Sequence, residues 1–161
     1  MTDRILSAVR WTLMGWFSLG VVAFAASGRS IDIPERIHGA DRVVVASAAS
    51  VTPTWRSNVY GDQLIVSQVL LQVEETLKGD PQSSVLLALE GGTLGGVTLT
   101  VSSVPDVKPG ERAVFFLDRA GNNEHVPHLK GLGILKLDQT NQVQGSSLRL
   151  EDIRRMAAQD K

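Results

Sequence analysis

The stretch from Glu90 to Leu117 decides the fold and reads E-G-G-T-L-G-G-V-T-L-T-V-S-S-V-P-D-V-K-P-G-E-R-A-V-F-F-L. Two glycine pairs open it and lead into the alternating run V-T-L-T-V, which predicts a half-buried strand over residues 97–101. A Pro-Gly-Glu-Arg turn then leads into Arg112–Leu117, which is apolar on both faces and predicts a central strand. The stretch therefore predicts strands joined by tight glycine and proline turns.

The glycine pairs share only their spacing with a phosphate-binding loop. Gly91 and Gly96 fit the pattern G-x-x-x-x-G, but such a loop needs a lysine next, and Val97 stands in that place. Strands are expected on both sides, so no helix N-terminus would point its N–H groups at an anion. We therefore expect the glycines to form a bulge or corner where two backbones approach. We expect any binding site to lie outside this stretch.

The rest of the chain alternates short apolar runs with Gly and Pro turns, which is typical of a β-sandwich or a closed barrel. The run from Gln63 to Leu77 fits a helical stripe as well as a strand, and its Val and Ile content favours a long strand. Pro53 is expected to end the strand before it. The expected elements are a helix over residues 31–40, strands over 42–51, 63–77, 84–89, 97–101, 112–117, 126–129 and 133–137, and a helix from 147 onward.

Composition and charge argue for a folded domain that does not bind nucleic acid. Of the 161 residues, 43% are hydrophobic and 20% are charged, as is typical of globular domains. The formal net charge is −1, and residues 28–161 carry 14 basic and 16 acidic side chains. A nucleic-acid-binding protein needs a basic face to displace counterions, so no nucleic-acid partner is expected.

The first 27 residues have the layout of an export signal. Arg4 and Arg10 precede an uncharged run over residues 11–26, which contains the A-x-A pattern at residues 23–25. This run is shorter than the about 20 apolar residues that a membrane-spanning helix needs. We therefore expect a cleaved signal and a location in the periplasm or outside the cell. The alternative is an uncleaved segment that anchors the protein in the inner membrane through residues 11–26.

No catalytic or metal-binding set is recognisable in the sequence. The chain has no cysteine, which excludes disulfides, thiolate metal sites and cysteine nucleophiles. On a strand, His125 and His128 would point to opposite faces, and zinc needs three or four ligands, so surface histidines are expected. Glu74 and Glu75 would also point apart, and no serine lies in a nucleophile motif. We expect no catalytic residue, no cofactor and no metal.

An expected loop from Thr54 to Asp62 carries Trp55, Arg56 and Tyr60. Exposed aromatic side chains beside an arginine are common in binding hot spots. The alternative is that Trp55 covers the end of a barrel. Trp55, Arg56 and Tyr60 form the predicted protein-binding surface.

Four motifs of the chain resemble those of an uncharacterised family of exported bacterial proteins. They are A-D-x-V-V, V-E-x-x-L-K-G-D, G-G-T-x-G-G and P-G-E-R-x-x-x-F-L, at residues 40–44, 73–80, 91–96 and 109–117. The first two expected strands and the loop between them also resemble the start of a netrin-like or tissue-inhibitor-of-metalloproteinase-like domain. Together the resemblance covers about residues 33–140.

This resemblance implies an OB-like β-barrel with a flanking helix. Together with the expected elements, it predicts a mostly β fold: a closed or partly open OB-like barrel with a short helix before the first strand and a C-terminal helix. The expected organisation is a signal or anchor over residues 1–27, the OB-like barrel over 28–145, and a helix over 146–161 that packs on the barrel or trails from it. Inhibitor activity is not implied, because metalloproteinase inhibitors reach the catalytic zinc with an N-terminal cysteine, which this chain lacks. Only the loop Thr54–Asp62 corresponds to part of their inhibitory surface.

We therefore expect an exported, non-catalytic β-barrel module that binds a protein partner, such as a protease or an envelope component. One alternative is a carbohydrate-binding module, because OB-like barrels often bind oligosaccharides. Sugar sites usually use several aromatic side chains, and only Trp55 and Tyr60 are candidates here. The other alternative is a hydrolase with an unrecognised site.

Overall fold

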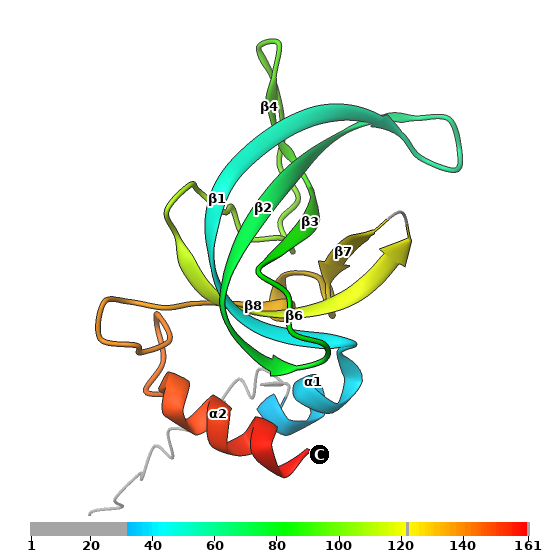
Figure 1. The fold of residues 1–161 in the computed structure, drawn as a ribbon. Helices are drawn as coiled ribbons and strands as arrows, with labels where there is room; N and C mark the ends of the chain where they lie inside the picture. Colours follow the sequence, from blue (N-terminus) through cyan, green and yellow to red (C-terminus); the bar gives the residue numbers. More distant parts are fainter. Residues whose placement is uncertain (1–31, 122, 161) are drawn as a thin grey trace, which may run out of the picture. The chain divides into compact units, whose positions relative to one another are not determined.

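The computed structural model describes residues 32–121 and 123–160. The expected signal over residues 1–27, and with it the alternative anchor over 11–26, lies outside the described residues. No helix within the described ranges is long and apolar enough to span a bilayer. The chain is mostly β, as expected (Figure 1). The elements in chain order are α1 (Ile33–Gly39), β1 (Arg42–Ser57), β2 (Gln63–Lys78), β3 (Ser84–Glu90), β4 (Gly92–Leu94), β5 (Val97–Leu99), β6 (Arg112–Gly121), β7 (Glu124–Pro127), the 3-10 helix η1 (Lys130–Gly133), β8 (Ile134–Lys136) and α2 (Leu150–Gln159).

Five strands form a ring. β1 pairs with β2, β2 with β3, β3 with β7, β7 with β6, and β6 again with β1. All these pairs are antiparallel except β3 with β7, which run parallel. β8 pairs with β6, and β4 and β5 form a small sheet of their own. Ring closure gives each of the five strands two neighbours, but only over part of its length: β6 pairs with Arg42–Ser47 of β1, and β3 pairs with Ser67–Gln72 of β2.

Successive side chains of a β-strand point to opposite faces of the sheet, so the apolar side chains of β1 and β6 pack into two separate cores. Inside the ring, Val44 and Phe115 pack with the inward residues of β2 and β3. On the outer face, Val43 and Phe116 pack against residues of the two helices. Because both faces of β6 are buried, every residue from Ala113 to Leu117 is apolar, which confirms the predicted central strand.

The helices α1 and α2 pack over the outer core. In α1, Pro34 occupies the first turn, where its fixed φ suits a helix start, and Ile37 is fully buried. The expected spacing of the C-terminal helix is confirmed, because Leu150, Ile153 and Ala157 are all buried. This helix begins at Leu150 and not at residue 147, since residues 144–147 form turns and bends and Arg149 is extended and bridges to Gln142.

One β2 side chain joins both helices. The Nζ of Lys78 donates hydrogen bonds to the carbonyls of Ile37 (2.8 Å) and His38 (2.9 Å) at the end of α1. It also lies 3.1 Å from a carboxylate oxygen of Asp160, which follows α2. A cation is favourable at a helix C-terminus because the last carbonyls carry partial negative charge.

β1 and β2 form a long hairpin whose far half extends from the ring (Figure 1). The expected end of the strand at Pro53 is wrong: β1 continues to Ser57, and Pro53 pairs with Ser67. Pairing of β1 with β6 covers only Arg42–Ser47. Beyond it β1 is an edge strand, where the missing N–H of a proline is tolerated.

The glycine pairs form a corner and a turn. An ideal Cβ at Gly91 would lie 3.0 Å from the carbonyl oxygen of Leu99, and one at Gly92 would lie 2.5 Å from the Oγ of Ser67. Two chain segments therefore approach closely at this point, which confirms the expected corner. Gly95 and Gly96, with φ of 60° and 79°, form the turn between β4 and β5. The half-buried strand over 97–101 is wrong, because β5 ends at Leu99 and Val97 is 51% exposed.

Candidate functional site

The tip of the β1–β2 hairpin holds two adjacent apolar side chains in water. Val59 is 93% exposed and Tyr60 is 86% exposed. Neither side chain adds to the core, so the fold gains nothing from their apolar character. Tyrosine is enriched in binding hot spots because it offers a large rigid surface and a hydroxyl group.

Asn58 holds this tip in one conformation. Its Oδ1 accepts hydrogen bonds from the backbone N–H groups of Tyr60 and Asp62, both at 2.9 Å. Its Nδ2 donates to the carboxylate of Asp62 at 3.0 Å, and its backbone N–H donates to the carbonyl of Asp62 at 2.9 Å. Gly61 has a φ of +87°, which glycine adopts without strain. A turn that is already ordered loses less conformational entropy on binding.

Trp55 and Arg56 lie in the paired part of β1, so the expectation that they belong to a loop is wrong. Trp55 pairs with Ile65 and Arg56 with Leu64. Trp55 is 46% exposed. Of the three predicted contact residues, only Tyr60 lies in the turn.

Arg56 is engaged within the chain. Its guanidinium donates to both carboxylate oxygens of Glu124 on β7, at 2.7 Å and 2.5 Å. Gln68 donates to the same carboxylate at 2.9 Å. The hydrogen bonds from Arg56 hold the pKa of Glu124 below its usual range. Arg56 therefore fixes the hairpin to the ring and is not a free donor for a partner.

One face of the hairpin leads from Trp55 to a cavity. Residues directly opposite on antiparallel strands share a face, and every second residue along a strand does the same. Trp55 and Ile65 therefore share their face with Pro53 and Ser67, the pair two residues closer to the ring. Ser67 also lines the cavity, but it is only 7% exposed, because Gly92 of β4 lies against Ser67, Ile65 and Pro53 on this face.

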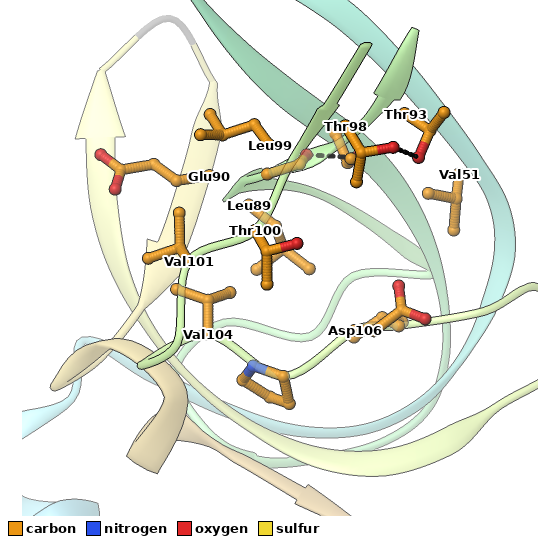
Figure 2. A pocket seen from close by; sticks show the side chains of 15 residues that line it. Val51, Leu89, Glu90, Thr93, Thr98, Leu99, Thr100, Val101, Val104 and Asp106 are labelled. Carbon is orange, nitrogen blue, oxygen red and sulfur yellow. Dashed lines mark hydrogen bonds between the residues drawn. The ribbon is translucent and has the colours of Figure 1, made fainter. Parts of the chain in front are cut away.

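The cavity has a volume of about 290 Å³ and lies between the end of β3, the β4–β5 hairpin and residues 100–107 (Figure 2). Its lining combines aliphatic side chains, three threonine hydroxyls and two carboxylates. Figure 2 shows the carboxylates of Glu90 and Asp106 at opposite sides, with aliphatic side chains and Thr100 between them. Its described lining residues are Val51, Ser67, Leu89, Glu90, Gly91, Gly92, Thr93, Thr98, Leu99, Thr100, Val101, Val104, Pro105, Asp106 and Val107.

Backbone hydrogen bonds anchor the irregular wall of the cavity. The N–H of Val104 donates to the carbonyl of Val101 at 3.0 Å, and the N–H of Gly131 donates to the carbonyl of Ser103 at 2.8 Å. Beyond this wall, the N–H of Gly110 donates to the carbonyl of Ala48 at 2.8 Å. The wall is therefore tied to η1 and to β1, although it contains no strand or helix of its own.

The histidines do not behave as expected. His125 is only 8% exposed, so its expected place on the surface is wrong. Burial and the charge of Arg42 lower its pKa. The Nδ1 of His128 lies 2.9 Å from both carboxylate oxygens of Asp118. Within the described ranges, no group of three or more His, Asp and Glu side chains is placed to hold a metal ion.

A serine and a carboxylate meet at the start of the hairpin. The Oγ of Ser47 donates to Glu74 at 2.5 Å, and Arg112 donates to the other carboxylate oxygen at 2.6 Å. Burial raises the pKa of Glu74, but the hydrogen bonds from Ser47 and Arg112 outweigh it, and the pKa is lowered. A general base for serine would need a pKa near the working pH. Glu75 binds Arg154 instead, so the two adjacent carboxylates point apart, as expected.

Sequence reasoning missed Val59 and the cavity. The exposure of Val59 could have been predicted from the segment N-V-Y-G-D at residues 58–62. An asparagine three residues before a glycine is typical of a tight turn, and the two residues between them then lie at its tip. The cavity has no local signal, because its walls come from separate parts of the chain, and it lies in the stretch expected to contain no binding site. No protein-family model matches this sequence, and no curated protein matches it either.

Proposed function

We propose that the protein is an exported, non-catalytic module that binds a protein partner through the tip of the β1–β2 hairpin. The observation that supports this most is the exposure of Val59 and Tyr60, at 93% and 86%, on a turn that Asn58 holds rigid. A rigid turn with an aromatic side chain at its end can enter a groove of a partner at low entropic cost. Trp55, 46% exposed on the adjoining strand, enlarges the contact surface.

We also propose that the ring is an OB-like barrel of the netrin or metalloproteinase-inhibitor kind. Support comes from the strand order β1-β2-β3-β7-β6-β1 and from the parallel pairing of β3 with β7. In OB-folds, the loop between the first two strands takes part in ligand binding. That loop is the Asn58–Asp62 turn of this chain, so the fold proposal and the contact proposal point to the same surface.

The proposed location is the periplasm or the outside of the cell, on the ground of the signal-like residues 1–27. The alternative is an inner-membrane anchor through residues 11–26. In either place a protease or an envelope component is the class of partner proposed. No cofactor, metal or nucleic acid is part of the proposal.

The two alternative functions have less support. Carbohydrate binding usually relies on stacked aromatic rings, and the described lining of the cavity contains none. A hydrolase would need a base beside its nucleophile, and the carboxylate beside Ser47 has a lowered pKa.

Site-specific photo-crosslinking tests the proposed contact surface. A photoreactive phenylalanine analogue replaces Tyr60 in one variant and Leu132, which is 47% exposed on η1, in a matched control. Both variants are exported in the cells that make the protein, and the adducts are identified by mass spectrometry. We expect one protein adduct from position 60 that position 132 does not give.

Competition makes this test specific. Purified wild-type protein should suppress the adduct, whereas a Val59→Ser, Tyr60→Ser double variant should not suppress it at the same concentration. An adduct that the double variant suppresses as well as wild type does would place the contact away from the tip. Identical adducts from both crosslinking positions would count against the proposal.

A further inference from the structure

The cavity beside the β4–β5 hairpin has a lining that matches one kind of side chain. We propose that it binds a lysine or arginine side chain of the protein partner, presented on an extended segment. The inference rests on the proposed function, since it takes a protein partner as given and names the chemistry of one residue that the partner offers.

The middle of the cavity suits an aliphatic chain. Val51, Val101 and Val104 are half-buried and contribute apolar surface, whereas Leu89 and Val107 of the lining are buried in the inner core. Lysine and arginine carry three or four methylene groups that pack on such a surface while the charged end remains in contact with water. A volume of about 290 Å³ is suited to one long side chain and not to a folded element.

The rim of the cavity suits a cation. The charged residues of the described lining are Glu90 and Asp106, and the lining contains no lysine, arginine or histidine. The Glu90 carboxylate points away from the other lining side chains (Figure 2), so Asp106 supplies the negative charge at the rim. Lys108 lies 4.0 Å from a carboxylate oxygen of Asp106, but the two side chains are 70% and 80% exposed. Such a pair contributes little, so the carboxylate can take a ligand cation in place of Lys108. The hydroxyl of Thr100 can accept a further hydrogen bond from an ammonium or guanidinium group.

The free edge of β5 suits an extended backbone. Among the described strands, β5 pairs only with β4, so its second edge carries unpaired N–H and C=O groups. Thr98 and Leu99 of β5 line the cavity, as does Thr100 just after it. An extended peptide that added to this edge would send alternate side chains toward the cavity.

The cavity lies close enough to the Trp55 face of the hairpin for one protein partner to contact both. Ser67 of the cavity and Trp55 lie on one face of the hairpin, as the pairing of Pro53 with Ser67 and of Trp55 with Ile65 requires. A partner seated on Trp55 would therefore meet β4, which covers Pro53, Ile65 and Ser67 through Gly92 and also forms part of the cavity wall. This continuity favours a side chain of a protein over a free small amine.

Nuclear magnetic resonance titration with matched peptides tests the inference. The purified, isotope-labelled protein is titrated with the capped pentapeptide T-V-K-V-T and with versions that carry arginine, norleucine or glutamate in place of lysine. We expect the lysine and arginine peptides to shift the amide signals of residues 98–107. Norleucine keeps the aliphatic chain and lacks the charge, so it should bind about two- to fivefold more weakly, and glutamate should not bind.

Substitutions and added salt show how much of the peptide binding depends on the charge of the cavity and how much on its shape. Asp106→Asn should remove the preference for lysine over norleucine, and added salt should reduce it in the wild type. Asp80→Asn, an exposed carboxylate outside the lining, should leave the preference unchanged. Equal binding of lysine and norleucine peptides, or the absence of shifts at residues 98–107 with every peptide, would overturn the proposal. If spermidine shifts the signals of the same residues and binds more tightly than any peptide, the ligand of the cavity is a free polyamine and not a peptide side chain.

The test is independent of the hairpin tip. The Tyr60→Ser variant should respond to the lysine peptide as the wild type does, because the turn is not part of the cavity lining. A failed peptide titration together with a specific crosslink from position 60 would remove the cavity proposal alone. A lost crosslink together with an intact peptide response would remove the proposed contact surface alone.

Discussion

Arg56 and Glu124 are 68 residues apart in the chain and are joined by two hydrogen bonds from the guanidinium to the carboxylate, at 2.7 Å and 2.5 Å. Arg56 lies on the part of β1 that extends from the ring, and Glu124 begins β7. A planar guanidinium that meets a carboxylate with two parallel bonds also fixes orientation. This pair therefore sets the direction in which the hairpin presents Val59 and Tyr60.

Replacement of Arg56 by lysine should loosen the hairpin without unfolding the protein. Lysine keeps the charge but loses the two-pronged geometry. We expect the free energy of unfolding to fall by about 1 kcal/mol or less, because the Arg56 side chain is 35% exposed. The amides from Ser57 to Leu64 should exchange faster with deuterium. Arg155→Lys, in an exposed pair within α2, is the control and should change neither quantity; unchanged exchange in Arg56→Lys would show that the pair does not hold the hairpin.

The tip residues should be dispensable for stability. The Val59→Ser, Tyr60→Ser double variant should keep its free energy of unfolding within about 0.5 kcal/mol of the wild type, because both side chains are almost fully exposed. Asn58→Ala should cost about 0.5–2 kcal/mol, because it removes three hydrogen bonds of the turn. Leu71→Ala in the inner core should cost about 2–5 kcal/mol. Chemical unfolding measures all three, and a large loss in the double variant would mean that the tip serves the fold.

Acid should destabilise the protein in two separate ranges, of which the first depends on His125. Burial and the charge of Arg42 lower the pKa of His125 below its ordinary 6.5, with Arg119 acting in the same direction and Asp41 and the carbonyl of Leu86 in the other. Below pH 6.5 His125 is therefore protonated more readily in the unfolded chain than in the folded chain. The free energy of unfolding falls as the pH falls from 6.5 toward the pKa of His125 in the folded chain. Above pH 6.5 this contribution is fully present.

The second range begins below pH 4.5. Hydrogen bonds hold the pKa values of Glu74, Glu111 and Glu124 below that ordinary value, so their contribution is present above it and is lost as the pH falls further. A His125→Phe variant should therefore lose the slope of unfolding free energy just below pH 6.5 and keep the slope below 4.5. Chemical unfolding at a series of pH values measures both slopes. The same upper slope in His125→Phe and in wild type would assign it to another group.

The parts of the fold that could be predicted from the sequence depend on local patterns. Arg112–Leu117 is apolar at every position because its strand is covered on both faces, and α2 has its three buried residues at helical spacing. The end of β1 could not be predicted, since the effect of Pro53 depends on whether a second neighbour is present at that point. That neighbour, β6, is distant in sequence and stops pairing at Ser47.

The candidate site was harder to predict for the same reason. Tyr60 could be recognised because its turn is local, whereas the engagement of Arg56 depends on Glu124. The burial of His125 follows from the parallel pairing of β7 with β3, which no local pattern encodes. The cavity exists only because closure of the chain brings Val51 and Ser67 next to residues 89–107.

Gly92 should be needed both for its conformation and for its lack of a side chain. Its φ is +134°, and an ideal Cβ would lie 2.5 Å from the Oγ of Ser67. We expect Gly92→Ala to lower the free energy of unfolding by about 1–3 kcal/mol. Ser67→Ala alone loses the hydrogen bond from its Oγ to the carbonyl of Gly91 (2.7 Å), so it is the reference for the double variant. Measured against that reference, Gly92→Ala should cost less than in the wild type but should still cost the part due to backbone strain. Gly95→Asn is the matched control and should be nearly neutral, since Gly95 has a φ of +60° with no atom within 4 Å of an added Cβ, and asparagine tolerates that conformation. A double variant as stable as Ser67→Ala would show that the backbone at Gly92 is unstrained and that the contact with Ser67 alone requires glycine at this wall of the cavity.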